Sequence, residues 1–178
     1  MSQHTIWTQW DDLNVPSKFK RLSPSTTPIE NADLSEITFY VPIYMGGRPA
    51  LELTKKMPNL KILQMPNAGY DDAIEYIRPG ITLCNGKSIH DDSTAELAVG
   101  LTIASLRGFP DFIRNQDKSD WVHVKNKSIN DRKIGIIGFG SIGTTIAKML
   151  SGFTVEIIAF TQSGRDNTIV ITDLDKHL

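Results

Sequence analysis

Residues 133–150 read KIGIIGFGSIGTTIAKML, and this stretch decides how the rest of the chain is interpreted. An apolar β-branched run predicts a strand, three glycines at the spacing G-x-G-x-x-G form a loop, and helix-forming sequence follows. We expect Gly138 to allow a tight turn, Gly140 to let a pyrophosphate approach the backbone, and Gly143 to let the helix pack on the strand. The stretch predicts a dinucleotide site at the positive end of a helix; the alternative is an ordinary glycine-rich turn.

Composition restricts the class of protein. The chain has 178 residues, of which 40% are hydrophobic, enough for one domain or two small ones with a sizeable core. Its 19 basic and 20 acidic residues nearly cancel, which gives no indication of a nucleic-acid partner. The single cysteine, Cys84, excludes a disulfide framework and a cysteine-based zinc site and fits a cytoplasmic protein. Without a signal-peptide pattern or a long apolar run, we expect a soluble protein that does not contact a membrane.

The first half of the chain alternates short apolar runs with turn and helix signals. This alternation predicts a parallel sheet with helical crossovers. The Pro/Ser/Thr-rich connection that ends at Pro28 has room for a short strand only. A strand that begins at Ile37 is interrupted by Pro42, and Pro49 is expected as the first residue of a helix. The other expected strands are residues 5–10, the run that ends near Met65 and residues 81–85, and the expected helices are residues 49–56 and 71–78.

The character of the sequence changes at residues 90–93, HDDS. Ser93 and Glu96 have the spacing of a capping box, and the helix that follows is apolar almost all round. We expect that helix to end near Gly108 and to be buried on most sides, against two lobes or against a partner subunit. A second helical piece through residue 116, a polar linker over residues 121–131 and a strand over residues 155–160 complete the pattern.

The sequence after residue 132 is short for the fold that the glycines predict. A complete dinucleotide-binding sheet has two βαβαβ halves. Residues 133–178 supply two strands and one helix, and the tail adds at most one short strand. We therefore expect a fragment with an incomplete second lobe, in which residues 1–90 form a first, substrate-binding lobe and residues 91–178 form the interdomain helix and the second lobe.

Several stretches, in the same order along the chain, resemble the D-isomer-specific 2-hydroxyacid dehydrogenases. LQMPNAGYDDA (63–73) is similar to the substrate loop of that family, and NGKSIHDDSTAELAVGLTIASLR (85–107) is similar to its crossover and long helix. Trp121 and the glycine stretch complete the series. The resemblance implies an α/β protein with a flavodoxin-like substrate lobe followed by the start of a Rossmann dinucleotide-binding lobe. It also implies a homodimer and reversible hydride transfer between a nicotinamide cofactor and C2 of a small 2-oxo or 2-hydroxy acid.

The resemblance assigns substrate-binding residues to two loops. Residues 67–70 match the family loop whose backbone N–H groups hold the substrate carboxylate. The alternative for this loop is a turn that needs Gly69 for its dihedral angles. Residues 44 and 45 match a loop that borders the substrate pocket, with plain packing as the alternative. The expected substrate-binding residues are Asn67, Ala68, Gly69, Tyr70, Tyr44 and Met45.

The resemblance and the second strand of the glycine unit together predict the cofactor contacts. NAD-binding sequences carry an acid about 20 residues beyond the glycines, to bind the ribose 2′-hydroxyl. Here residues 161–165 read TQSGR, so a hydroxyl and a guanidinium replace the acid and suit a 2′-phosphate. We expect NADP rather than NAD, although Asp166 in a shifted turn would restore NAD binding. The expected cofactor-binding residues are Gly138, Phe139, Gly140, Ser141, Ile142, Gly143, Thr161, Ser163, Arg165 and, on the nicotinamide side, Thr94.

No catalytic residue is expected within this chain. The family resemblance implies an arginine, a glutamate and a histidine in catalysis, and no position of this sequence matches them. Because loss of a positioned acid costs about 10²–10⁴-fold in rate, we expect negligible turnover by residues 1–178 alone. His90, Asp91 and Asp92 have metal-ligand chemistry, but a polar hinge before a helix is the interpretation that we adopt, and we expect no metal site.

Two functions of other classes remain as alternatives. The same fold serves non-catalytic dinucleotide-binding sensors and corepressor-like modules, since fold alone does not decide function. A decayed gene product without activity is the third interpretation.

Overall fold

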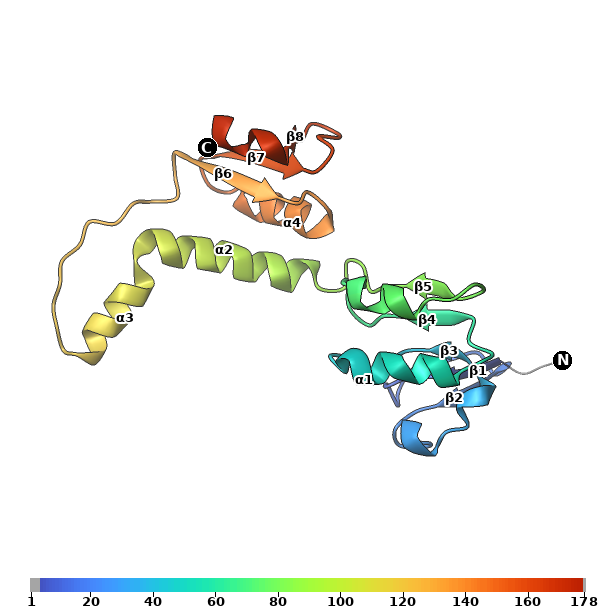
Figure 1. Ribbon diagram of the computed structural model, residues 1–178. Coiled ribbons are helices and arrows are strands. Elements are labelled where there is room, and N and C mark those ends of the chain that lie inside the picture. The colour runs from blue at the N-terminus through green and yellow to red at the C-terminus, as the bar shows by residue number, and fades with distance from the viewer. Residues whose placement is uncertain (1–3, 178) are drawn as a thin grey trace. The chain divides into compact units, whose positions relative to one another are not determined.

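The computed structural model describes residues 4–177, which form two compact units with the boundary between Ile89 and His90 (Figure 1). The boundary lies one residue from the position that the sequence suggested. Both units contain a parallel sheet, so the α/β class predicted from the alternation of strands and helices is confirmed.

The first unit has a five-stranded parallel sheet in the order β2-β1-β3-β4-β5. This is the flavodoxin-like order, in which the chain starts near the middle of the sheet and reverses direction once. The flavodoxin-like lobe that the family resemblance implied is therefore present. Its strands are β1 (His4–Trp7), β2 (Phe19–Leu22), β3 (Ile37–Tyr40), β4 (Ile62–Gln64) and β5 (Thr82–Cys84).

One strand prediction needs correction, and the interruption predicted at Pro42 is confirmed. β1 ends at Trp7 rather than at residue 10, although Thr8 still donates its N–H to the Leu22 carbonyl at 3.0 Å. β3 ends at Tyr40, two residues before Pro42, because a proline has no N–H to continue a ladder. The short strand expected in the proline-rich connection is present as β2.

The helices of the first unit are shorter and tighter than predicted. α1 (Gly47–Glu52) begins two residues before Pro49, which the first turn accepts because its N–H groups have no intrahelical partner. The helix continues as a 3₁₀ segment, Leu53–Lys56. The helix expected after β4 is a 3₁₀ segment, Asp71–Tyr76, and not an α-helix. Two further 3₁₀ turns, Ile29–Asn31 and Leu34–Glu36, precede β3.

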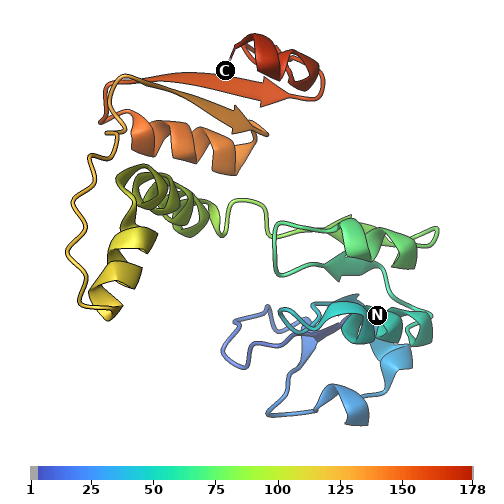
Figure 2. The ribbon, with the colours of Figure 1, turned by 60° about the vertical axis from the view of Figure 1, so that its left-hand side comes forward.

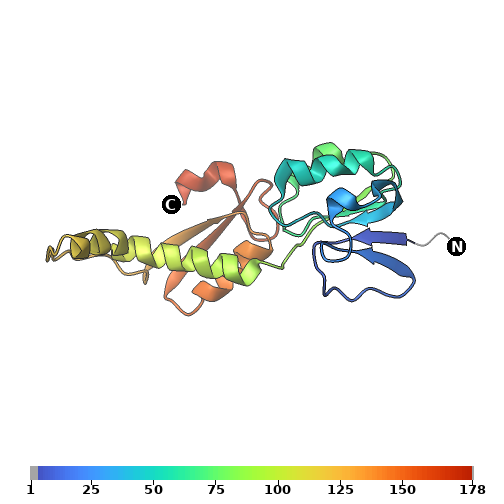
Figure 3. The ribbon, with the colours of Figure 1, turned by 90° about the horizontal axis from the view of Figure 1, so that it is seen from below.

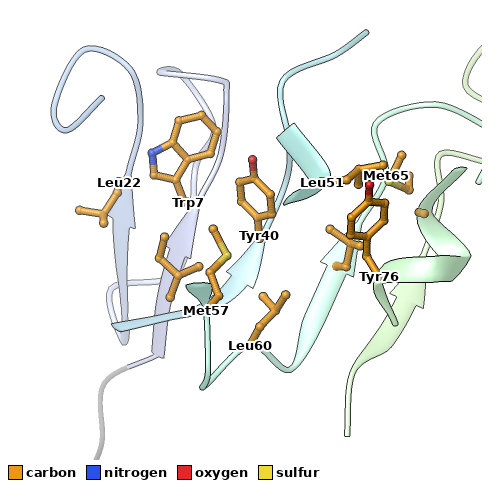
Figure 4. Close-up of a cluster of buried hydrophobic side chains, with 11 residues drawn as sticks. Trp7, Leu22, Tyr40, Leu51, Met57, Leu60, Met65 and Tyr76 are labelled. Carbon is orange, nitrogen blue, oxygen red and sulfur yellow. The ribbon is translucent and has the colours of Figure 1, made fainter. Parts of the chain in front are cut away.

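A single apolar core supports the first sheet (Figure 4). The rings of Trp7 and Tyr40 lie with their centroids 5.7 Å apart on neighbouring strands, and both side chains are buried. The Tyr40 hydroxyl donates to the Ala50 carbonyl at 3.1 Å, and burial raises the pKa of this hydroxyl above its ordinary value. The buried members of this core are Trp7, Leu22, Ile37, Tyr40, Leu51, Met57, Leu60, Leu63, Met65, Ala73 and Tyr76.

The second unit combines helices with a three-stranded parallel sheet in the order β6-β7-β8. An extended segment returns from the end of α3 to β6 (Figure 2), as expected for the polar linker. The strand–glycine loop–helix–strand order predicted from residues 133–150 is confirmed, and the tail adds one short strand. The elements are α2 (Asp91–Arg107), α3 (Phe109–Asp117), β6 (Arg132–Ile137), α4 (Ser141–Leu150), β7 (Val155–Thr161), β8 (Ile169–Val170) and a 3₁₀ segment, Ile171–Lys176.

The capping-box prediction for α2 is wrong. The helix begins at Asp91, so Ser93 lies inside its first turn and donates its hydroxyl back to the His90 carbonyl at 3.3 Å. Asp91 and Asp92 place negative charge on the N-terminal turn, where it interacts favourably with the positive end of the helix dipole. They are therefore the start of the helix and not a hinge before it. The helix ends as expected, with Gly108 in the left-handed region at φ 69°.

The second unit alone does not bury α2 on most sides, and the predicted burial against two lobes or a partner subunit stays a prediction. α4 lies alongside α2 (Figures 1 and 3), and the fully buried residue of α2 is Ala95. Leu97 and Leu101 remain 62% and 60% exposed because no described element of the second unit covers their face. At 17 residues α2 is the longest helix, and none of the described helices is long and apolar enough to cross a membrane.

Candidate functional site

The three glycines after β6 have three different structural roles. Gly138 has φ of +90°, which only glycine adopts readily, and its N–H donates to the Phe160 carbonyl on β7 at 2.8 Å. A Cβ on Gly143 would lie 2.3 Å from the Gly138 carbonyl oxygen, so the helix reaches the turn only because this residue has no side chain. A Cβ on Gly140 would contact nothing within 4 Å, so the fold itself does not demand glycine there.

The N-terminus of α4 offers donors to an anion. Gly140 is the N-cap residue and supplies no side chain that could cap the helix. The first backbone bond of the helix runs from the Thr144 N–H to the Gly140 carbonyl at 3.0 Å, which leaves the N–H groups of residues 141–143 without an intrahelical partner. Free N–H groups and the helix dipole together form an anion site. The loop thus fits the pyrophosphate of a dinucleotide.

The turn after β7 is held by hydroxyl groups. Thr161 Oγ1 accepts from the Gly164 N–H at 3.0 Å and lies 2.7 Å from Thr168 Oγ1, so this hydroxyl already has partners inside the turn. Ser163 and Arg165 are exposed, and no side-chain hydrogen bond is recorded for either within residues 4–177. Of the predicted contacts in this turn, Ser163 and Arg165 are therefore the ones with donors to spare.

The loops after β3 and β4 meet at the carboxyl edge of the first sheet. β3 and β4 are adjacent and parallel, so the segments that follow them leave the sheet at the same edge. A hollow of about 170 Å³ is lined by Met45 from one loop and Asn67 from the other, with Asp72 also at its wall. In open parallel sheets, ligands bind outside this edge.

The loop after β3 carries backbone strain. Met45 has φ of +59°, a left-handed conformation that is uncommon for a side chain of this size, and it is 82% exposed. The Tyr44 N–H donates to the Gln9 side-chain oxygen at 2.8 Å, which ties the loop to the end of β1. A strained and exposed apolar residue beside a hollow is typical of a ligand site.

Gly69 is not there for its dihedral angles. Its φ lies outside the left-handed region, and a Cβ would meet only the Asn67 side-chain nitrogen at 3.5 Å, an ordinary contact. The alternative interpretation of this loop, a turn that needs glycine, is therefore wrong. Gly69 and Tyr70 are exposed, and Asn67 and Ala68 are partly buried.

Two polar side chains that were not predicted hold these loops. Gln9 binds the backbone of Tyr44, and the Asn85 side-chain nitrogen donates to the Ala68 carbonyl at 2.7 Å. The only sequence signal was indirect: Asn85 opens the second stretch that resembles the family. Arg48, beside the first loop, pairs with Glu75 at 2.8 Å, and this exposed bridge raises the pKa of Arg48 while adding little stability.

Residues 90–94 form no metal site in the described structure. Within residues 4–177, no group of three or more histidine, cysteine or acidic side chains is placed to hold a metal ion. Thr94 is exposed in the first turn of α2, and its N–H donates to the His90 carbonyl at 3.0 Å. Its cofactor contact stays a prediction. Arg107 lies in the last turn of α2, where its positive charge interacts favourably with the negative end of the helix dipole.

Comparison with known proteins identifies the family. Residues 99–177 match the family model described as "D-isomer specific 2-hydroxyacid dehydrogenase, NAD binding domain", which includes the whole glycine unit. These residues, which make up most of the second unit, belong to the NAD-binding domains of the D-isomer specific 2-hydroxyacid dehydrogenase family. The resemblance noted in the sequence is thereby confirmed, and the second unit is the start of a Rossmann dinucleotide-binding lobe of this family.

Relatives from this dehydrogenase family cover most of the chain. A glyoxylate/hydroxypyruvate reductase of Arabidopsis thaliana is 33% identical over 57% of this chain and 33% of its own length. A glycerate dehydrogenase of Methylorubrum extorquens is 25% identical over 89% of this chain and 53% of its own.

Solved structures of this dehydrogenase fold are also similar. An NADPH-dependent glyoxylate/hydroxypyruvate reductase of Sinorhizobium meliloti, solved with NADP and sulfate, has a TM-score of 0.78 and 19% identity and covers 98% of this chain and 59% of that one. At that identity the similarity establishes the fold. The chain spans 33%, 53% and 59% of the length of these three relatives.

The close contact at Gly143 generates a stability prediction. Gly143→Ala places a methyl group against the Gly138 carbonyl and should destabilise the second unit by about 1–3 kcal/mol. Gly100→Ala is the matched control, since its Cβ would lie in open space on α2 and should stabilise the helix by about 0.5–1 kcal/mol. Thermal unfolding followed by circular dichroism measures both. Equal unfolding midpoints for Gly143→Ala and the unchanged chain would contradict the contact.

Proposed function

We propose that this chain supplies the substrate-carboxylate loop and the dinucleotide-phosphate loop of an NADP-dependent 2-hydroxyacid dehydrogenase. The proposed reaction transfers a hydride between the cofactor and C2 of a small 2-oxo or 2-hydroxy acid. The observation that carries this proposal is the glycine unit, where Gly138 makes the turn, Gly143 admits the helix, and Gly140 leaves open space beside free N–H groups. Similarity to the dehydrogenase family supports the same activity.

The substrate part of the proposal rests on the loop over residues 67–70. The family resemblance assigns the substrate carboxylate to its backbone N–H groups. Gly69 is exposed and is not required by the backbone conformation, so its lack of a side chain is explained by the approach of an anion. Tyr44 and Met45 border the same edge of the sheet and would contact the remainder of a small acid.

The cofactor part of the proposal rests on the turn after β7. Ser163 and Arg165 are exposed donors at the end of the second strand, where an acid would repel a 2′-phosphate. When bound, the nicotinamide cofactor supplies the hydride, and the groups of this chain bind and orient its phosphates. Two structural neighbours that were solved with NADP bound support the same choice of cofactor.

The choice of cofactor can be tested on Arg165. Arg165→Ala should weaken NADP binding roughly ten- to hundredfold, because a charge-assisted bond contributes about 1.5–3 kcal/mol, and should leave NAD binding unchanged. Isothermal titration with each cofactor measures both affinities. Arg114→Ala is the control, since Arg114 is an exposed arginine of the same unit that pairs with Asp111. Unchanged NADP affinity in Arg165→Ala would count against this role.

The catalytic acid is outside the residues that this chain contributes. Hydride addition to a carbonyl leaves an alkoxide that must be protonated, and no residue of the chain matches the family's histidine. We therefore expect residues 1–178 alone to reduce glyoxylate, pyruvate or hydroxypyruvate slower by about 10²–10⁴-fold than an enzyme with a positioned acid. Oxidation of NADPH, read against a blank without 2-oxo acid, measures the rate. Turnover of about 1–10³ per second would refute this expectation.

The proposal includes a homodimer built on the second unit. Large apolar side chains remain exposed on α2, on α3 and on the extended segment that follows α3. In that segment Trp121 is 95% exposed. Beside it is a hollow of about 610 Å³ between α3 and that segment. Exposed apolar surface of this kind marks an interface, and the net charge of −1 offers little repulsion between two copies. The residues are Leu97, Leu101, Phe109, Phe112, Ile113, Trp121, Val122 and Val124.

The homodimer can be tested by sedimentation. The chain should sediment at about twice its mass of 19.8 kDa, and Trp121→Ser should shift the equilibrium toward the monomer because it removes the largest exposed apolar group. Trp10→Ser is the control, since Trp10 is a partly exposed tryptophan of the first unit. A monomer at every concentration, or equal effects of the two substitutions, would contradict the proposed interface.

The proposed compartment is the cytoplasm. One cysteine in 178 residues fits a reducing environment, where thiols stay unpaired. Cys84 is partly buried and forms no disulfide.

A further inference from the structure

The loop after β4 is joined to the segment after β5 by two hydrogen bonds. The Gly86 N–H donates to the Asn67 carbonyl at 2.8 Å, and the Asn85 side-chain nitrogen donates to the Ala68 carbonyl at 2.7 Å. Gly86 is buried, and a Cβ there would lie 2.9 Å from the Pro66 carbonyl oxygen, so the two segments are in close contact. Two successive carbonyl groups of the substrate loop therefore point toward residues 85 and 86.

This arrangement fixes where the N–H groups of the loop point. In a trans peptide the carbonyl of one residue and the N–H of the next point in opposite directions, and no described peptide bond is cis. The N–H groups of Ala68 and Gly69 must then both point away from residues 85 and 86. Neither N–H donates to a backbone carbonyl within residues 4–177. Successive N–H groups on one side of a chain form a nest that binds anions.

The nest lies on the side of the substrate loop opposite the segment after β5. β4 lies between β3 and β5 in the sheet, so the side away from residues 85 and 86 is the side of the loop that follows β3. That loop carries Tyr44 and Met45, and Met45 lines the same hollow as Asn67. An anion bound by the nest would therefore lie between the two loops that the family resemblance assigns to the substrate.

The two bonds that orient the nest differ in kind. The bond to the Asn67 carbonyl comes from the backbone of Gly86 and does not depend on the side chain of Asn85. The bond to the Ala68 carbonyl comes from the side chain of Asn85, 17 residues away, and within residues 4–177 it is the hydrogen bond that holds the peptide carrying the Gly69 N–H. Because Ala68 is only partly buried, we expect water to replace this bond without holding the direction of the carbonyl.

We propose that Asn85 is a positioning residue for the substrate carboxylate: its side-chain amide holds the Ala68 carbonyl so that the Gly69 N–H points at the anion. This inference rests on the proposed function of the substrate loop. Asparagine suits the task because its NH₂ group donates and carries no charge that would compete for the carboxylate. An aspartate of the same shape would repel the carbonyl oxygen and the bound anion.

The inference can be tested by titrating the isotope-labelled chain with pyruvate and following its amide resonances. Saturable shifts are expected at Ala68 and Gly69 in the unchanged chain. Asn85→Ala should weaken the apparent affinity about tenfold and reduce the shift at Gly69 more than that at Ala68. Asn85→Asp keeps the shape and loses the donor, so it should weaken binding at least as much. The midpoint of thermal unfolding is measured for each variant.

Asn59→Ala is the matched control. The Asn59 side chain also donates to a backbone carbonyl, that of Ser35 at 2.8 Å, but in a different part of the first unit. It should leave the pyruvate affinity unchanged even if it lowers the unfolding midpoint as much as Asn85→Ala does. Equal affinity for the unchanged chain and for Asn85→Ala or Asn85→Asp would overturn the positioning role alone. No saturable shift at Ala68 or Gly69 in the unchanged chain would overturn the proposed substrate loop and the inference with it.

Discussion

Parallel pairing of neighbouring strands is the constraint on which both candidate sites depend. In the first unit Phe39 pairs with Ile62 and Ile62 pairs with Thr82, so three strands end at one edge and their loops leave the sheet together. In the second unit Ile137 pairs with Phe160, which places the glycine loop and the turn after β7 at one edge in the same way. Without this register, the residues assigned to an anion or to a dinucleotide would have no common location.

The glycine unit could be predicted from the sequence because each of its parts has a local cause. A β-branched run forms the strand, and Gly138 and Gly143 are needed for a backbone angle and for a close contact that other residues do not allow. The ends of elements were less predictable. Ser93 and Glu96 have the capping-box spacing, yet α2 starts at Asp91, because acidic residues favour the first turn as well as a hydroxyl cap does.

Contacts between distant parts of the chain were beyond the reach of sequence reasoning. Gln9 holds the backbone of Tyr44 across 35 residues, and Asn85 holds that of Ala68 across 17. Such bonds between a side chain and a remote carbonyl or N–H leave no periodicity and no spacing that could be recognised. The surface that covers α2 could not be predicted either, because an apolar helix indicates that burial is needed and does not say which surface provides it.

The glycines of this chain divide into those that the fold requires and those that it does not. A side chain at Gly143 or Gly86 would collide with the backbone, whereas one at Gly69 or Gly140 would meet ordinary contact or open space. Selection for folding and selection for ligand binding therefore act on separate positions. A descendant of this protein that no longer had to bind its ligands would be free to replace Gly69 and Gly140, would keep Gly86 and Gly143, and would still fold. Whether glycine remains at positions 69 and 140 would then indicate whether such a lineage still binds its ligands.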